Sequence, residues 1–326
     1  MKIKRTAIFL ILAILASLSA NFYSAYASSD YIYLGGIPAG FSLSTRGAYV
    51  VGLCDVVNEK GVYSPSKDAE LEVGDIILYI DEYEINGAAD IERAITNGEK
   101  KILVVSRKGE KLFLDITPAI DFGGNYRIGV FVRENINGIG TVTFIKNGRF
   151  ASLGHPVLDD DGMILDIKGG VLYPCNITGF VKGEKGKPGE LRGNFLKKSP
   201  CANIEKNTCQ GVFGTLTDSD FTLGLKKISV GEARMGNASI VTTIDGCTPK
   251  EYSISIVKVD TINKDNKNFV IKITDDELIS KTGGIIQGMS GSPIVQDNKI
   301  IGAVTHVFIN DPTRGFGISI DNMLNI

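Results

Sequence analysis

The stretch QGMSGSPIV, residues 287–295, decides how the chain is interpreted, and the apolar run IIGAV follows it at residues 300–304. Ser290 is closely flanked by glycines, which let the backbone fold tightly enough for the amides of Ser290 and Gly288 to point at one spot. Such a pair forms an oxyanion hole, where losing one donor costs on the order of 10²–10³ in rate. The stretch predicts a nucleophilic serine in a strand-turn context, with a plain Gly-Ser turn as the alternative.

A serine hydroxyl needs a base, and the chain contains two histidines, His155 and His306. His155 follows small residues and precedes a polar turn, a loop setting suited to a reactive group; a surface-turn histidine is the alternative. His306 lies in an apolar strand and is interpreted as a core or pocket-wall residue. The acid that would orient the imidazole has several candidates: Asp218, Asp220, Asp245, Asp260, Asp275 and Asp276.

Composition and charge narrow the class of protein. The 326 residues suffice for two domains, and a net charge of -2 gives no electrostatic footprint for nucleic acid. With 38 glycines and few long helical patterns, the composition favours a β-rich protein with tight turns.

The N-terminus carries an export pattern. A basic cluster (MKIKR, residues 1–5) precedes an apolar stretch at residues 7–20, and an A-x-A site ends at Ala27. The apolar core is short for a membrane span, which needs about 20 residues, so residues 1–29 are predicted as a signal peptide or a retained anchor. Because the positive flank stays inside, the rest of the chain is expected outside the cytoplasmic membrane.

The cysteines and histidines give no metal-binding pattern. No C-x-x-C occurs, and two histidines are too few to favour a zinc hydrolase, so we predict neither metal nor cofactor. Cys201 and Cys209 are close enough in sequence to bridge one loop in an oxidising space; the alternative is that all five cysteines are small apolar packing residues.

Residues 30–120 are predicted to form one small unit. A short strand at residues 49–53, the segment LEVGDIILYI at 71–80, a helix at 90–95 and a hairpin around Lys108-Gly109 follow one another. This order resembles a PDZ domain. The resemblance places Gly40, Phe41, Ser42 and Leu43 in a peptide-binding loop, whose backbone N–H groups capture a peptide C-terminus while the peptide adds a strand. A β-rich spacer that binds nothing is the alternative.

Residues 121–326 are predicted to form a second unit, after a polar, Gly-containing junction at residues 121–125. Short strand candidates separated by turns, among them residues 140–145, 240–244, 269–273 and 300–304, favour a sandwich or barrel. The serine segment is similar to the G-D/N-S-G-S/G-P segment of chymotrypsin-like peptidases, with Met289 in place of the acidic or amide residue. The expected fold is therefore mainly β: a PDZ domain followed by a chymotrypsin-like β-barrel peptidase domain.

Several longer stretches are similar to the stage IV sporulation protein B peptidase family. They are RIGVFVR (127–133), GIGTVTF (138–144), LGH (153–155), PGE (188–190), ITD (273–275) and the run from Gln287 to Phe308. The resemblance implies a triad of His155 as base, Asp275 as orienting acid and Ser290 as nucleophile, with Gly288 and Ser290 forming the oxyanion hole. Asp276 stands where the family is expected to have proline, so Asp275 and Asp276 stay open as alternatives for the acid.

The resemblance also implies a biological role. Family members act in endospore formation, in the space between the two forespore membranes. They cleave themselves and a membrane-embedded regulator, which releases an intramembrane metalloprotease to process a mother-cell sigma factor precursor. The implied partners are that regulator, PDZ-bound peptide termini and the chain itself. The alternatives are a general envelope quality-control peptidase, which the order of the two units disfavours, and an inactive scaffold, which the presence of both His155 and Ser290 disfavours.

Overall fold

The computed structural model describes residues 31–159, 161–260, 262–263 and 266–325. The predicted export segment, residues 1–29, lies outside these described residues. The described part is mainly β, and none of its helices has the length and hydropathy needed to cross a membrane.

The chain consists mostly of strands, three of them long (β1, β10 and β12), with a few short helices. The strands are β1 (Tyr31–Leu53), β2 (Val56–Asn58), β3 (Gly61–Tyr63), β4 (Ile76–Ile80), β5 (Tyr83–Glu84), β6 (Lys101–Arg107), β7 (Glu110–Ile116), β8 (Ala119–Ile120), β9 (Tyr126–Arg127), β10 (Val130–Lys146), β11 (Arg149–Ser152), β12 (Ile167–Val181), β13 (Glu190–Phe195), β14 (Ala202–Thr208), β15 (Gly211–Leu216), β16 (Lys227–Val230), β17 (Gly236–Thr242), β18 (Lys250–Val259), β19 (Phe269–Ile273), β20 (Pro293–Gln296), β21 (Lys299–Phe308) and β22 (Asp311–Ser319). The helices are α2 (Pro65–Asp68), α3 (Ala88–Ala94), α4 (Asp276–Thr282) and α5 (Ile320–Leu324), with a 3-10 turn at Ser219–Thr222.

A first barrel closes through six antiparallel strands in the order β1, β10, β11, β15, β14, β12 and back to β1. Its interior is filled by side chains that alternate along the strands, such as Phe41 and Leu43 of β1 and Phe150 of β11. Closure pairs both edges of every strand over this region, which removes the exposed edges of an open sheet.

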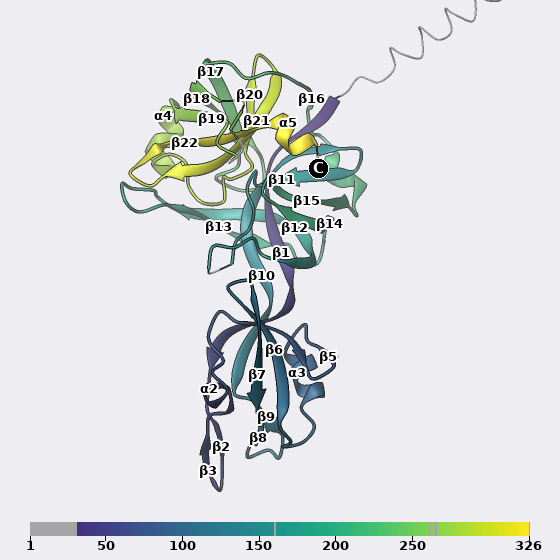
Figure 1. The fold of residues 1–326 in the computed structure, drawn as a ribbon. Helices are drawn as coiled ribbons and strands as arrows, with labels where there is room; N and C mark the ends of the chain where they lie inside the picture. The colour runs from purple at the N-terminus through teal and green to yellow at the C-terminus, as the bar shows by residue number, and fades with distance from the viewer. Residues whose placement is uncertain (1–30, 160, 261, 264–265, 326) are drawn as a thin grey trace, which may run out of the picture.

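A second barrel closes in the same way, in the order β17, β18, β19, β22, β21, β20 and back to β17. Isoleucines two residues apart point into its core, for example Ile254 and Ile256 of β18. Figure 1 shows this barrel beside the first, with β16 next to both. The expected mainly β fold with a β-barrel domain after the small unit is thus confirmed, and the strand pairing shows two closed barrels.

The small unit is an insertion into the hairpin between β1 and β10. The two strands pair from Tyr33↔Ile145 in the barrel to Leu53↔Val130 in the unit, so they run through both parts. There they meet β4, β6 and β7 around a separate core that includes Ile77, Leu103 and Ile91 of α3. Figure 1 shows the unit hanging from the barrels by these two strands.

Two expectations about this unit are corrected. Residues 40–43 lie in β1, where Gly40 pairs with both Ile139 of β10 and Tyr173 of β12. A strand with a neighbour on each side offers no loop for a peptide terminus, so the predicted PDZ loop is misplaced. The expected start of the unit at residue 30 also differs, since residues 31–45 complete the first barrel. The helix and the Lys108-Gly109 hairpin occur as expected, while the PDZ assignment itself stays a prediction.

The cysteines are all free. Cys201 is buried in the core of the first barrel and Cys209 is exposed in the turn between β14 and β15, so the pair that sequence spacing allowed is not bridged. Burial raises the pKa of the Cys201 thiol to about 12, which makes it an unreactive packing residue.

Candidate active site

A cleft of about 640 Å³ lies between the two barrels. The first barrel contributes Phe41 and Leu43, residues 136–139 of β10 and the loop after β11, while the second contributes residues 285–288, Ser290 and residues 305–307. Most of these side chains are apolar. The polar groups include His155, Ser290 and His306, so the two residues most strongly predicted for catalysis do share one site.

The nucleophile turn leads into β20. Ser292 is buried, and its hydroxyl and N–H both donate to the Met289 carbonyl, at 2.6 and 3.0 Å. Met289 is also fully buried, in the core of the second barrel, and its sulfur accepts the Ile286 N–H at 3.4 Å. The apolar surroundings suit a methionine at position 289, and this packing leaves Ser290, not Ser292, facing the cleft.

In this turn, the backbone N–H groups of Gly288 and Ser290 have no hydrogen-bond partner among the described residues. The Gln287 carbonyl accepts the Leu191 N–H at 2.8 Å, and the Met289 carbonyl is taken by Ser292. Because C=O and N–H of a trans peptide point in opposite directions, the N–H groups of Gly288 and Ser290 face away from these partners. Neither amide donates to another described group, and both residues line the cleft. Gly288 has a φ of +94°, which suits glycine. The two amides are therefore available as the predicted oxyanion hole.

His155 is placed by a sharp turn at the end of β11. Leu153 and Gly154 both have positive φ, +67° and +71°, and such strain in a non-glycine residue is typical of functional sites. The His155 Nδ1 lies 2.8 Å from the Pro156 carbonyl. A carbonyl can only accept, so Nδ1 carries the proton and Nε2 keeps its lone pair.

Burial lowers the pKa of His155 below its ordinary value, although the bond to the Pro156 carbonyl acts in the opposite direction. The imidazole is therefore neutral at neutral pH, which is the form a general base needs. The His306 ring lies against it, with centroids 4.9 Å apart and planes at 39°. His306 is thus a wall of the cleft, as predicted, and burial together with His155 and Lys267 lowers its pKa to about 4.

The Ser290 hydroxyl donates to the Thr305 carbonyl at 2.8 Å. In this arrangement its proton is held by β21 and not by His155. Transfer to His155 requires rotation about the Ser290 Cα–Cβ bond, in line with the loose catalytic hydrogen bonds common in ligand-free enzymes.

Asp275 does not occupy the place predicted for it. It is the N-cap of α4, where one carboxylate oxygen accepts the Leu278 N–H at 3.0 Å and the other the Ser253 N–H at 3.4 Å. Asp275 and Asp276 are both absent from the cleft lining, and no ion pair joins either to His155 within the described chain. In this structure the Pro156 carbonyl, not a carboxylate, fixes the tautomer of His155.

Sequence patterns could have indicated the cap. An aspartate just before a short helix that ends at Gly283, in the left-handed conformation, is the usual signature of an N-cap and a glycine C-terminus. Thr141 had no such signal: it is one of several small polar residues in β10, yet it bonds directly to the nucleophile turn.

In the part of the chain that the structure describes, no cluster of three His, Cys, Asp or Glu side chains could hold a metal ion.

Two closed β-barrels, with a Gly-flanked serine and a half-buried histidine in the cleft between them, define a serine peptidase. Residues 124–324 match the SpoIVB peptidase S55 family, and the chain belongs to that family. Among solved structures, the active form of the Rv3671c protease from M. tuberculosis is 12% identical with a TM-score of 0.37, over 58% of this chain and 72% of that one. Its inactive form is 13% identical with a TM-score of 0.35, over 57% and 81%. No curated protein matches the chain.

Proposed function

We propose that the chain is a sporulation endopeptidase in which Ser290 is the nucleophile and His155 the general base. The observation that carries the catalytic part is that both residues, with the Gly288 and Ser290 amides, face one cleft between the barrels. Membership of the SpoIVB peptidase family supports the finer role, in which the enzyme is exported to the forespore intermembrane space and cleaves itself and a membrane-embedded regulator. Asp275 keeps the role of orienting acid only as a prediction from the family resemblance.

The mechanism follows from these positions. His155 Nε2 takes the Ser290 proton as the oxygen attacks a peptide carbonyl, and the Gly288 and Ser290 amides bind the resulting oxyanion. His155 then protonates the leaving amine, and the acyl-enzyme forms. Water attacks the ester in the same way, with His155 again accepting a proton, which releases the acid and regenerates Ser290.

A fluorophosphonate probe tests the nucleophile. The probe forms an Oγ–P bond and loses fluoride, so it should label the full chain and fail to label Ser290→Ala. Mass spectrometry of the labelled peptide then separates Ser290 from the nearby Ser292, which the structure buries. Equal labelling of the parent and Ser290→Ala, or an adduct on Ser292, would show that the nucleophile is wrongly assigned.

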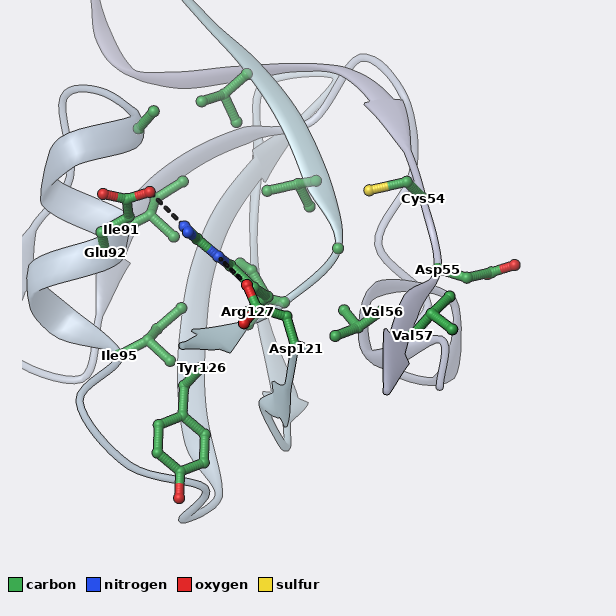
Figure 2. Close-up of a pocket in the computed structure, with 15 residues that line it drawn as sticks. Cys54, Asp55, Val56, Val57, Ile91, Glu92, Ile95, Asp121, Tyr126 and Arg127 are labelled. Carbon is green, nitrogen blue, oxygen red and sulfur yellow. Dashed lines mark hydrogen bonds and ion pairs between the residues drawn. The ribbon is translucent and has the colours of Figure 1, made fainter. Parts of the chain in front are cut away.

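The small unit has a cavity suited to a peptide partner. It measures about 230 Å³ and lies between α3 and the start of β10, lined by Ile91, Ile95, Val130 and Val132. Within the described chain β1 alone pairs with β10 over residues 130–133, so the edge of β10 that faces away from β1 is open to an added strand. Figure 2 shows Arg127 beside the cavity, bonded to Glu92 and Asp121. We propose that this groove, in place of residues 40–43, receives an extended peptide of the substrate.

Co-expression with the candidate membrane regulator tests the substrate. New N-termini of the regulator should appear with the parent enzyme and not with Ser290→Ala. Val132→Asp places a charge in the groove and should reduce this cleavage. The control is Phe131→Asp, on the exposed face of the same strand, where Phe131 is 61% exposed. This control should leave the cleavage unchanged. Cleavage that persists unchanged in Val132→Asp would exclude the groove from substrate capture, while probe labelling would still report the catalytic site.

A further inference from the structure

We propose that Thr141 is a positioning residue of the peptidase. It holds the nucleophile turn in the conformation that presents the oxyanion amides. The inference rests on Ser290 being the nucleophile, as proposed above, and it adds a residue from the opposite barrel to the machinery of the site.

The contacts of Thr141 reach both catalytic loops. Its hydroxyl donates to the Gly288 carbonyl at 2.9 Å, and its N–H donates to the Ser290 carbonyl at 3.1 Å. Its own carbonyl accepts the Ser152 hydroxyl at 2.7 Å and the Leu153 N–H at 3.4 Å, just before His155. Only 1% of the Thr141 surface is exposed, so water does not compete for these hydrogen bonds. One residue therefore ties the serine turn to the histidine loop.

The bond to the Gly288 carbonyl has a particular consequence. Gly288 has no side chain, and its φ of +94° leaves the two flanking peptide planes to be fixed by their partners. Leu191 fixes the plane before Gly288 through the Gln287 carbonyl, and Thr141 fixes the plane after it. Without the Thr141 hydroxyl the Gly288 carbonyl loses this partner, so the second plane is no longer fixed by it. This plane also contains the Met289 N–H, which donates to the Ile286 carbonyl at 3.1 Å, and it joins the planes that carry the Gly288 and Ser290 amides. Without the hydroxyl it keeps only the Met289 bond, so the direction of the two amides relative to one another becomes less well defined.

The close approach of β10 to the turn supports this role. A Cβ on Gly291 would lie 2.2 Å from the Thr141 carbonyl oxygen, so backbone touches backbone at this point. Thr143, two residues further along β10, donates its hydroxyl to the Gly291 carbonyl at 2.7 Å. The strand thus forms a continuous support for residues 288–291, and Thr141 contacts the part that carries the oxyanion amides.

The test compares the fluorophosphonate rate constant in four variants of the full chain. Thr141→Val keeps the shape and removes the hydroxyl, Thr141→Ser keeps the hydroxyl, and Thr141→Ala provides a second variant without it. Thr243→Val is the matched control, because Thr243 is also buried and donates its hydroxyl to a glycine carbonyl, that of Gly36 at 3.0 Å, away from the cleft.

We expect Thr141→Val and Thr141→Ala to react about 10 to 100-fold more slowly, since a misplaced oxyanion donor approaches the cost of a lost one. Thr141→Ser and Thr243→Val should stay within about 3-fold of the parent. Should Thr141→Val fail to fold, the Ser and Ala variants still differ by a single hydroxyl. A Thr141→Ala rate equal to that of Thr141→Ser, or an equal slowing in Thr243→Val, would overturn the proposal. Failure of Ser290→Ala to lose labelling would instead refute the nucleophile.

Discussion

At the scale of single residues, His155 combines partial burial with a fixed tautomer. The Pro156 carbonyl holds the proton on Nδ1, and burial disfavours the imidazolium. A neutral base over a wide pH range is the result. The neighbouring His306 ring contributes to this burial, because it lies against the imidazole. His306 is itself neutral above its pKa of about 4.

The pH dependence of probe labelling follows from this arrangement. Only neutral His155 can accept the Ser290 proton, so the rate should fall as the pH drops through the His155 pKa. Since burial lowers that pKa, the acid limb is expected below pH 6.5, the ordinary value for histidine. His306→Asn removes the covering ring and should move the limb upward toward 6.5. A limb at or above 6.5 in the parent would contradict the burial argument.

At the scale of elements, α4 depends on its cap. Asp275→Ala removes the acceptor of the Leu278 N–H and should lower the free energy of unfolding by about 1 kcal/mol, whereas Asp275→Asn, an equally good cap, should change it by a few tenths. Asp276→Asn, one residue beyond the cap, is the control. Chemical denaturation measures the differences, and equal losses in Asp275→Ala and Asp276→Asn would exclude a capping role.

The same variants separate the cap from the predicted catalytic acid. Asp275→Asn keeps an acceptor for the Leu278 N–H, loses the long bond from the Ser253 N–H, and removes the negative charge. A stable but unreactive Asp275→Asn would support the role implied by the family, which requires the carboxylate to leave the cap. Retained labelling would confine Asp275 to α4.

The elements also show how far sequence reasoning reaches. Local patterns located β19 at residues 269–273, the helix near residue 90 and the hairpin at Lys108-Gly109, because each depends on neighbouring residues. Motifs likewise selected Ser290 and His155, which the structure brings together in one cleft. Local patterns could not predict the position of residues 40–43, because β1 pairs with β10 and β12, which lie about a hundred or more residues further along the chain. Thr141 was missed for the same reason: its bond to Gly288 spans 147 residues.

At the scale of the whole molecule, the strand β10 links the two cavities. Val130 and Val132 line the groove of the small unit, residues 136–139 line the catalytic cleft, and Thr141 bonds to the nucleophile turn. The insertion is therefore joined to the site by continuous backbone, although it has its own core. This geometry distinguishes two ways of removing the small unit.

Deleting residues 31–118 should unfold the peptidase, because β1 supplies Ala39, Phe41 and Leu43 to the core of the first barrel. Joining Thr45 to Glu134 through Asn-Gly should instead preserve it. Ser44 already pairs with Asn135, so a two-residue turn can close the shortened hairpin. We expect this second variant to unfold cooperatively and to react with the fluorophosphonate within about 10-fold of the parent, since the barrels and Thr141 are retained. Its cleavage of the membrane regulator should be lost with the groove. If the variant folds but does not react, the small unit is required for the catalytic geometry itself, and β10 transmits more than substrate capture.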